Sequence, residues 1–204
     1  MDRFKSMTEL LSLFPSDGDY EIQFNISRNT NIKLFAPHGG CIEPCTGTLV
    51  MEIAGESFDY YVFHGMMKKN CFQTLHVSST QFDEPRCQQM ARQALVAVAI
   101  HGCEAEKEFV EIGGANRKLV TSLRNHLIAQ GFPTVFATKN RKGEDERNFI
   151  NLARHKGLQL ELSSGFRKSL FPDFPRTLQR NPKTVRLFIS AMQKWLHSVE
   201  QTIT

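Results

Sequence analysis

The sequence lacks any apolar run that approaches the roughly 18 residues of a membrane-spanning helix. It also lacks internal repeats, low-complexity tracts and any shift of composition that would mark a domain boundary. Near the N-terminus, Thr8, Glu9 and Ser12 interrupt the apolar stretch, which is therefore too short for the hydrophobic core of a signal peptide. These absences predict one domain over residues 1–204 and a cytoplasmic protein that would leave a cell by lysis.

The cysteines follow no recognisable pattern. The five cysteines form no CxxC pair, and their odd number excludes a complete disulfide framework within one chain. We therefore expect reduced thiols and an intracellular protein. Cys41, Cys45 and Cys103 flank the turns discussed below and offer an alternative thiolate zinc site, although their spacing is a weak signal for one.

An excess of charge of one sign is absent as well. Lys and Arg number 25 against 21 Asp and Glu, which gives a formal net charge of +4 spread along the chain. The basic run at residues 139–142 is followed at once by acidic residues, which favours a polar loop over a nucleic-acid contact. With 41% hydrophobic residues the chain should bury a core, and we expect a monomer without nucleic-acid or membrane partners.

Short apolar segments alternate with longer helical patterns. Three stretches have helical patterning, Glu84–Ala94, Asn116–Gln130 and Pro182–Val199. The predicted strands are Tyr20–Ile26, Ile32–Ala36, Phe58–Phe63, Thr74–Val77, Leu95–Ile100, Thr134–Ala137 and Leu158–Leu162. The alternation predicts an α/β domain whose open, mixed and mostly parallel sheet is flanked by helices. Active sites of such sheets lie beyond the carboxyl ends of the strands.

Three predicted strand ends carry polar residues suited to catalysis. His38 is followed by Gly39 and Gly40, which allow a sharp turn, and Glu43 comes five residues after the histidine. His101 follows the apolar run LVAVAI and precedes a glycine. Two imidazoles and one carboxylate are the ligand set of a catalytic zinc site that keeps one position open. His76, also near a predicted strand end, competes for the place of third ligand.

The third strand end contains Glu161. In the segment GLQLELS, leucines alternate with Gln159, Glu161 and Ser163, so the carboxylate lies on the face away from the leucines. A carboxylate at this position could accept a proton from water and pass it to a leaving nitrogen. Taken one by one, these residues also suit ordinary structural roles. Their joint occurrence indicates a metal hydrolase.

At these residues the sequence resembles the poly-γ-glutamate hydrolase family of bacteriophages and bacilli, whose fold is similar to that of zinc carboxypeptidases. The similarity covers most of the chain, and its segments are APHGGCIEPCTG, LHVSSTQFDEPRC, AIHGCEAEKEFVEIGG and GLQLELSSGFR, at residues 36–47, 75–87, 99–114 and 157–167. The resemblance implies an endo-hydrolase of γ-glutamyl amide bonds with one Zn²⁺ held by His38, Glu43 and His101, and with Glu161 as general base. It favours His101 over His76.

The chain departs from the family pattern after the first motif. Many relatives have glycine where Cys45 stands and Ser-Glu where Gly47-Thr48 stands, so a carboxylate that would orient the ligands is missing here. Two other functions stay open. One is a zinc amidohydrolase of a small N-acyl amino acid, and the other is a non-catalytic binder of an acidic polymer.

An acidic polymer substrate requires cations near the metal. The candidates are Arg117, Arg154 and Arg167, because the planar guanidinium binds a carboxylate through two hydrogen bonds. Arg167 alone lies inside a matching segment. For Arg117 and Arg154 a solvated surface position is an equal alternative.

Overall fold

The structure is a computed structural model that describes residues 2–14, 18–138, 141–172 and 181–203. Its centre is a seven-stranded sheet with the order β1-β3-β2-β4-β7-β5-β6. The pairs β2–β3, β2–β4, β4–β7 and β5–β6 are parallel, whereas β1–β3 and β5–β7 are antiparallel. This confirms the predicted α/β class with an open, mixed and mostly parallel sheet flanked by helices.

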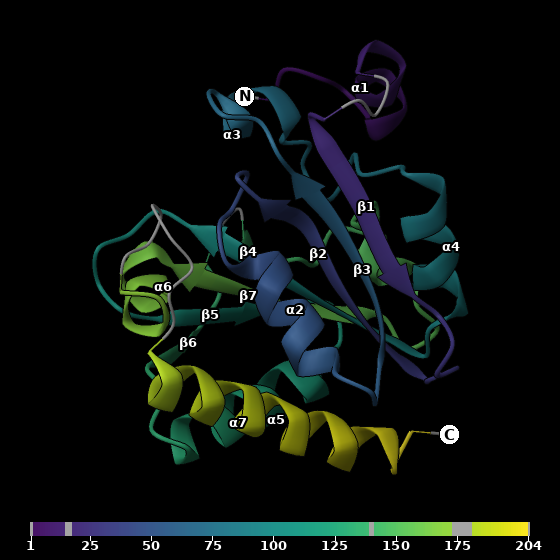
Figure 1. The fold of residues 1–204 in the computed structure, drawn as a ribbon. Helices are drawn as coiled ribbons and strands as arrows, with labels where there is room; N and C mark the ends of the chain where they lie inside the picture. Colours follow the sequence, from purple (N-terminus) through teal and green to yellow (C-terminus); the bar gives the residue numbers. More distant parts are fainter. Residues whose placement is uncertain (1, 15–17, 139–140, 173–180, 204) are drawn as a thin grey trace.

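Strands and helices are interspersed along the chain, with helices between most pairs of successive strands (Figure 1). The strands are β1 (Tyr20–Asn25), β2 (Ile32–Gly40), β3 (Asp59–Gly65), β4 (Val96–Cys103), β5 (Val110–Gly113), β6 (Thr134–Phe136) and β7 (Gly157–Ser163). The helices are α1 (Met7–Leu13), α2 (Thr46–Ala54), α3 (Cys71–Leu75), α4 (Pro85–Gln93), α5 (Arg117–Ala129), α6 (Ser164–Leu170) and α7 (Pro182–Glu200), with a 3-10 helix η2 at Phe149–Leu152.

The three predicted helices correspond to α4, α5 and α7, and all predicted strands except one lie in the sheet. The prediction of a strand at Thr74–Val77 is wrong, because α3 occupies Cys71–Leu75. Its N-cap, Asn70, has a left-handed backbone, and the Thr74 N–H donates to the Asn70 carbonyl at 2.9 Å. Local turn geometry therefore prevails over the β-branched composition of this segment.

Helices cover both faces of the sheet. Because successive side chains of a strand point to opposite faces, Leu34 and Phe35 of β2 belong to different core clusters. One cluster packs the sheet against α2, α5, α6 and α7, and the other packs it against α1, α3, α4 and η2. Figure 1 shows α2 in front of the central strands with α5 and α7 below it, and α4 on the right.

The cysteines differ from the sequence-based expectation. Cys41 and Cys71 form a disulfide across a separation of 30 residues, with the two Cα atoms 5.7 Å apart. The expectation that all five thiols are reduced is therefore wrong, and it no longer supports an intracellular setting. Cys45, Cys87 and Cys103 are free. The pairing brings the turn after β2 next to α3, a contact that cysteine spacing alone does not reveal.

The chain connections around the centre of the sheet define where a ligand can enter. β2 continues through α2 to β3 on one side, whereas β4 leads towards β5 and β7 on the other. A crevice at the carboxyl ends of the neighbouring strands β2 and β4 results from this divergence. Among the described residues, no helix has the length and apolarity that a membrane crossing requires.

Candidate active site

His38 lies near the carboxyl end of β2, where the strand is irregular. The pairing of β2 with β3 shifts its register around Pro37, which has no N–H to donate. Gly40 follows with φ of +66°, and a Cβ atom there would lie 2.1 Å from the Gly65 carbonyl oxygen. This position therefore requires glycine, and the strand can bend only because glycine is present.

A tight turn returns Glu43 to the histidine. The Glu43 N–H donates to the His38 carbonyl at 2.8 Å, and the Thr46 hydroxyl donates to the Glu43 carbonyl at 2.8 Å. As a result, Glu43 Oε1 lies 3.1 Å from His38 Nδ1. The five-residue spacing noted in the sequence thus brings the two side chains to the same point.

The outer nitrogen of His38 is bound by the backbone. His38 Nε2 lies 2.8 Å from the Val77 carbonyl oxygen, which can only accept a hydrogen bond. In its neutral, metal-binding form the imidazole would carry its proton on Nε2, and the Nδ1 lone pair would be available to a cation held beside Glu43. Metal-binding histidines have this arrangement, in which a protein acceptor fixes the tautomer of the ring.

His101 comes to the same point from β4. Its Nδ1 lies 3.2 Å from His38 Nδ1 and 3.6 Å from Glu43 Oε2. The next residue, Gly102, donates its N–H to Glu43 Oε2 at 2.8 Å, which fixes the carboxylate between the two strands. The imidazoles of His38 and His101 are both buried and lie side by side, as the metal hypothesis requires.

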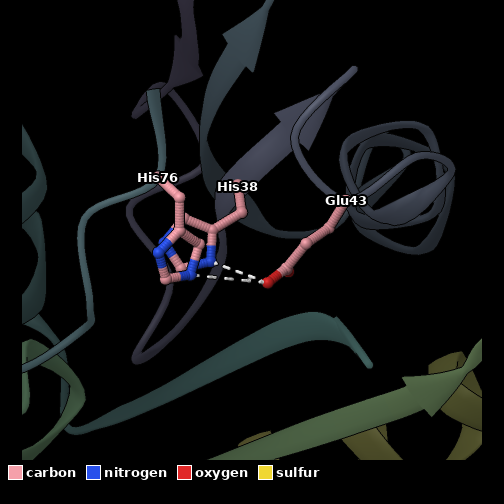
Figure 2. A group of neighbouring side chains, drawn as sticks. All are labelled: His38, Glu43 and His76. Carbon is pink, nitrogen blue, oxygen red and sulfur yellow. Dashed lines mark hydrogen bonds and ion pairs between the residues drawn. The ribbon is translucent and has the colours of Figure 1, made fainter. Parts of the chain in front are cut away.

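His76 is close to the same carboxylate. It follows α3 and lies against His38, with the ring centroids 4.2 Å apart and the planes tilted by 32°, and its Nε2 lies 3.9 Å from Glu43 Oε1 (Figure 2). Its Nδ1 lies 2.8 Å from an Asp2 carboxylate oxygen, so Nδ1 is the donor and Nε2 carries the lone pair. One ligand atom from each of His38, Glu43 and His76 lies within 4.8 Å of the others.

The donor set fits a zinc ion. Ligand bonds of about 2.0–2.1 Å in a tetrahedral site separate the ligand atoms by about 3.3 Å. The two Nδ1 atoms of His38 and His101 are 3.2 Å apart, and each lies near a different oxygen of Glu43, at 3.1 and 3.6 Å, which is close to this value. The 3.9 Å between His76 Nε2 and Glu43 Oε1 is longer. The chemistry of two or three imidazoles with one carboxylate also suits zinc.

The buried charges at this point influence one another. Burial alone would raise the pKa of Glu43, but the imidazoles of His38 and His101 lower it strongly. Burial would lower the pKa of His101, and the opposing attraction of Glu43 and Glu161 raises it above its ordinary value. Glu43 is therefore held as a carboxylate, the form that binds a cation.

Glu161 lies beside the imidazole cluster on the neighbouring strand. In the parallel pairing of β4 with β7, Glu161 is directly opposite His101, and in the antiparallel pairing of β5 with β7 it is opposite Glu111. Burial raises the pKa of Glu161 to about 7, and the carboxylates of Glu43 and Glu111 add to this effect. A carboxyl group with a pKa near neutrality can both accept and donate a proton in catalysis.

The three arginines predicted for substrate binding occupy different places. Arg167 of α6 lies at the crevice, where its guanidinium donates to the carbonyls of Pro44 and Cys103 at 3.2 Å each and packs on Gly102. Arg117 is exposed and paired with Glu144 at 2.8 Å, outside the cavity lining.

Arg154 lies at the other end of the sheet. It precedes the amino end of β7, and its N–H donates to the Ala94 carbonyl ahead of β4. The structure therefore brings together His38, Glu43, His101 and Glu161, with Arg167 beside them, and separates Arg117 and Arg154 from this group.

A cavity of about 940 Å³ opens over this cluster. Arg141 lines it, a residue that sequence reasoning assigned to a polar loop. The local sequence contains no signal for this role, because its partner Glu111 is 30 positions away. Besides His38, Glu43, His76, His101 and Glu161, the cavity lining includes Phe72, Gln73, Ser79, Lys142 and Asn148.

Comparison with protein families gives a match over nearly the whole chain. A family model described as poly-γ-glutamate hydrolase matches residues 4–194. The chain is 34% identical over 163 residues to the UPF0714 protein YmaC of Bacillus subtilis (strain 168), a match that covers 78% of this chain and 68% of YmaC.

Solved structures show the same fold. A bacteriophage poly-γ-glutamate hydrolase has a TM-score of 0.91 at 25% identity, with 98% of both chains covered. A zinc-free apo form of YndL has a TM-score of 0.88 at 29% identity, covering 97% of this chain and 98% of that one. The sequence match to the YndL protein of Bacillus subtilis (strain 168) spans 57% of its length.

Proposed function

Because the chain belongs to the poly-γ-glutamate hydrolase family, we propose that it is a zinc-dependent endo-hydrolase of the γ-glutamyl amide bonds of poly-γ-glutamate. The observation that carries this proposal is the convergence of His38, Glu43 and His101 at separations suited to one metal ion, with Glu161 next to them in a large cavity. The related protein YndL has a zinc-free apo form, which adds support for zinc because it implies that YndL also binds this metal.

In this proposal His38, Glu43 and His101 hold the metal. Their outer partners, Val77 and the Gly102 N–H, keep two of these ligands in the binding orientation. Zinc in such a site supplies Lewis acidity, which polarises an amide carbonyl and acidifies water. His76 lies close enough to compete for the third position, and zinc titration of the variants described in the Discussion distinguishes the two histidines.

Glu161 acts as the proton carrier of the reaction. It accepts a proton from the attacking water, and later donates this proton to the α-amine of the glutamyl unit that leaves. A pKa of about 7 suits both steps at neutral pH. The Gln159 amide donates to Glu161 Oε1 at 3.2 Å, which orients the carboxyl group within the cavity.

Arg167 is the predicted arginine that can act here. Its side chain is 1% exposed, and it is fixed by two carbonyls directly behind Gly102. We assign to it the stabilisation of negative charge that develops on the substrate carbonyl oxygen.

The test is incubation of the purified protein with poly-γ-glutamate, after metal analysis of the sample. We expect about one zinc per chain, a rapid fall in polymer size typical of internal cleavage, and loss of activity with a chelator that zinc restores. Cleavage of small N-acyl amino acids without any change in polymer size would instead establish the small-molecule amidohydrolase. Polymer binding that is indifferent to chelators and unaccompanied by cleavage would establish a non-catalytic binder.

A further inference from the structure

Arg141 lines the cavity and has one side of its guanidinium already in use. Its Nε and Nη2 lie 2.5 and 3.1 Å from the two carboxylate oxygens of Glu111, a fork that occupies one edge of the planar group. Its side chain is 41% exposed. Among the described residues Nη1 donates to no partner, which leaves the Nη1–Nη2 edge of the guanidinium open at the cavity wall.

The backbone of Arg141 is anchored as firmly as its head group. The Gln159 side-chain amide donates to the Arg141 carbonyl at 3.1 Å and to Glu161 Oε1 at 3.2 Å. Gln159 in turn accepts a hydrogen bond from Asn148 at 3.0 Å. One buried amide thus sets the position of Arg141 relative to the carboxyl group that carries the proton, and the arrangement is that of a built binding site.

Strand pairing places the parts of the site in one row. His101, Glu161 and Glu111 are directly opposite one another on β4, β7 and β5, so their side chains share one face of the sheet. Neighbouring strands are about 4.8 Å apart, which puts Glu111 about 10 Å from His101. Along this row, His101 with the proposed metal ligands comes first, then Glu161, and then Glu111 with Arg141.

In the polymer, the scissile amide, its leaving nitrogen and the neighbouring α-carboxylate follow one another in the same order. In a γ-glutamyl amide, the nitrogen that leaves is bonded to a carbon that also carries an α-carboxylate. Since Glu161 donates its proton to that nitrogen, the α-carboxylate must lie next to Glu161. The side of Glu161 away from His101 is the side of Arg141.

We propose that Arg141 binds the α-carboxylate of the glutamyl unit on the leaving side of the scissile bond, through the guanidinium edge that Glu111 leaves open. This inference rests on the proposed function and adds a determinant of its substrate specificity. It explains why a cation that already has a carboxylate partner lies at the cavity wall, because that partner fixes the orientation of the open edge. It also predicts selection for an acidic unit at one defined position of the substrate.

The test uses a short γ-glutamyl oligomer in which one internal unit has a carboxamide in place of its α-carboxylate. Product masses report which bonds are cut. We expect the native enzyme to cut the bond whose leaving nitrogen belongs to the carboxamide unit about 10- to 100-fold more slowly than the equivalent bond in the unmodified oligomer. The Arg141→Gln variant should have lost this difference. An identical product pattern for both proteins would overturn the proposal.

Two further variants control for folding and charge. Arg141→Lys keeps a cation beside Glu111 but loses the planar fork, and should discriminate only weakly. Arg147→Gln removes an exposed arginine of the same loop, which is paired with Asp145 at 2.7 Å and lies outside the cavity lining, and it should retain the native pattern. A loss of discrimination in Arg147→Gln equal to that in Arg141→Gln would contradict the assignment.

A binding measurement separates this inference from the proposed activity. Affinity for the unmodified oligomer is measured by calorimetry in the Glu161→Gln protein, with and without Arg141→Gln. A loss of about tenfold or more on removing Arg141 supports the carboxylate contact, even in a protein that cleaves nothing. An unchanged affinity overturns it, whatever the native enzyme hydrolyses.

Discussion

Buried charged side chains lie at both ends of the parallel strands, but they are paired differently at the two ends. At the amino end, Lys33 of β2 and Asp59 of β3 form a closed pair with Nζ and Oδ2 2.5 Å apart. Asp59 also accepts hydrogen bonds from the N–H groups of Arg28 and Thr30. Every charge there has a partner of opposite sign, and the pair is a structural connection between two strands.

At the carboxyl end, like charges are placed together. Glu43, Glu111 and Glu161 are all buried beneath a cavity, and their mutual repulsion contributes to the raised pKa of Glu161. Arg141 pairs with Glu111 and imidazoles lie beside Glu43, but among the described residues no Lys or Arg forms an ion pair with Glu43 or Glu161, so burial of these two carboxylates is unfavourable until a proton or a cation binds. Buried carboxylates without a cationic side-chain partner therefore distinguish the cavity end of this sheet from its opposite end.

Replacing the proton carrier should have the largest effect. We expect Glu161→Gln to lower kcat by about 100- to 10,000-fold with little change in zinc content, because the amide cannot accept the proton of the attacking water. The measurements are steady-state hydrolysis of poly-γ-glutamate and metal analysis of the same sample. As a control at the opposite end, the double variant Lys33→Met with Asp59→Leu should retain native kcat. Near-native turnover of Glu161→Gln would remove this residue from the mechanism.

Removing one partner of the Lys33–Asp59 ion pair should lower the free energy of unfolding and leave kcat unchanged. Asp59→Ala leaves the Lys33 ammonium buried without its carboxylate, at a cost of about 3–5 kcal/mol in the free energy of unfolding. Urea denaturation measures this loss, and the apolar double variant should recover most of it. A strong fall in kcat at temperatures where Asp59→Ala is folded would mean that the two ends are not independent.

Zinc titration can determine whether His101 or His76 is the third metal ligand. We expect His101→Ala to weaken zinc binding by at least about 100-fold and His76→Ala by about tenfold or less, since His101 has the separations of a direct ligand. Competition with a chromogenic chelator gives both affinities without an activity assay. The opposite order would make His76 the third ligand and His101 an accessory residue.

A smaller effect should appear in the pH dependence of stability of the zinc-free protein. Because the pKa of Glu161 is about 7 in the folded protein and 4.5 in the unfolded reference, the folded state retains a proton that the unfolded state releases. The contribution of this group to stability therefore falls as the pH rises from about 5 to about 8. Relative to the native protein, Glu161→Gln should gain about 1–3 kcal/mol over this range in denaturant titrations. A constant difference between the two proteins would show that burial does not raise this pKa.

Part of the site could be predicted from sequence because its signals are local. The glycines after His38 and the apolar run before His101 indicate strand ends, and alternation identifies the polar face on which Glu161 lies. Most strand positions follow from the same apolar runs. Parallel strands that are buried on both faces consist of nearly continuous apolar residues, which are easily recognised in the sequence.

The rest depends on pairing between distant segments. Arg141 acquires its position from Glu111, and Glu111 comes next to Glu161 only because the four-residue strand β5 runs antiparallel to β7. No spacing within the chain encodes that register. The disulfide between Cys41 and Cys71 escaped prediction for the same reason. The helix α3 was missed for a local reason, since the left-handed Asn70 begins a helical turn that the composition of Thr74–Val77 does not signal.

The position of β7 in the sheet affects the order in which the strands can pair during folding. β7 is the last strand of the chain, yet it is inserted between β4 and β5, and in the described residues β5 and β6 join the sheet through it alone. During folding, β5 and β6 can therefore join the sheet only after β7 has paired with β4, a long-range closure that slows folding. Because Glu161 lies on β7, the proposed proton carrier comes next to His101 only when this last pairing has formed.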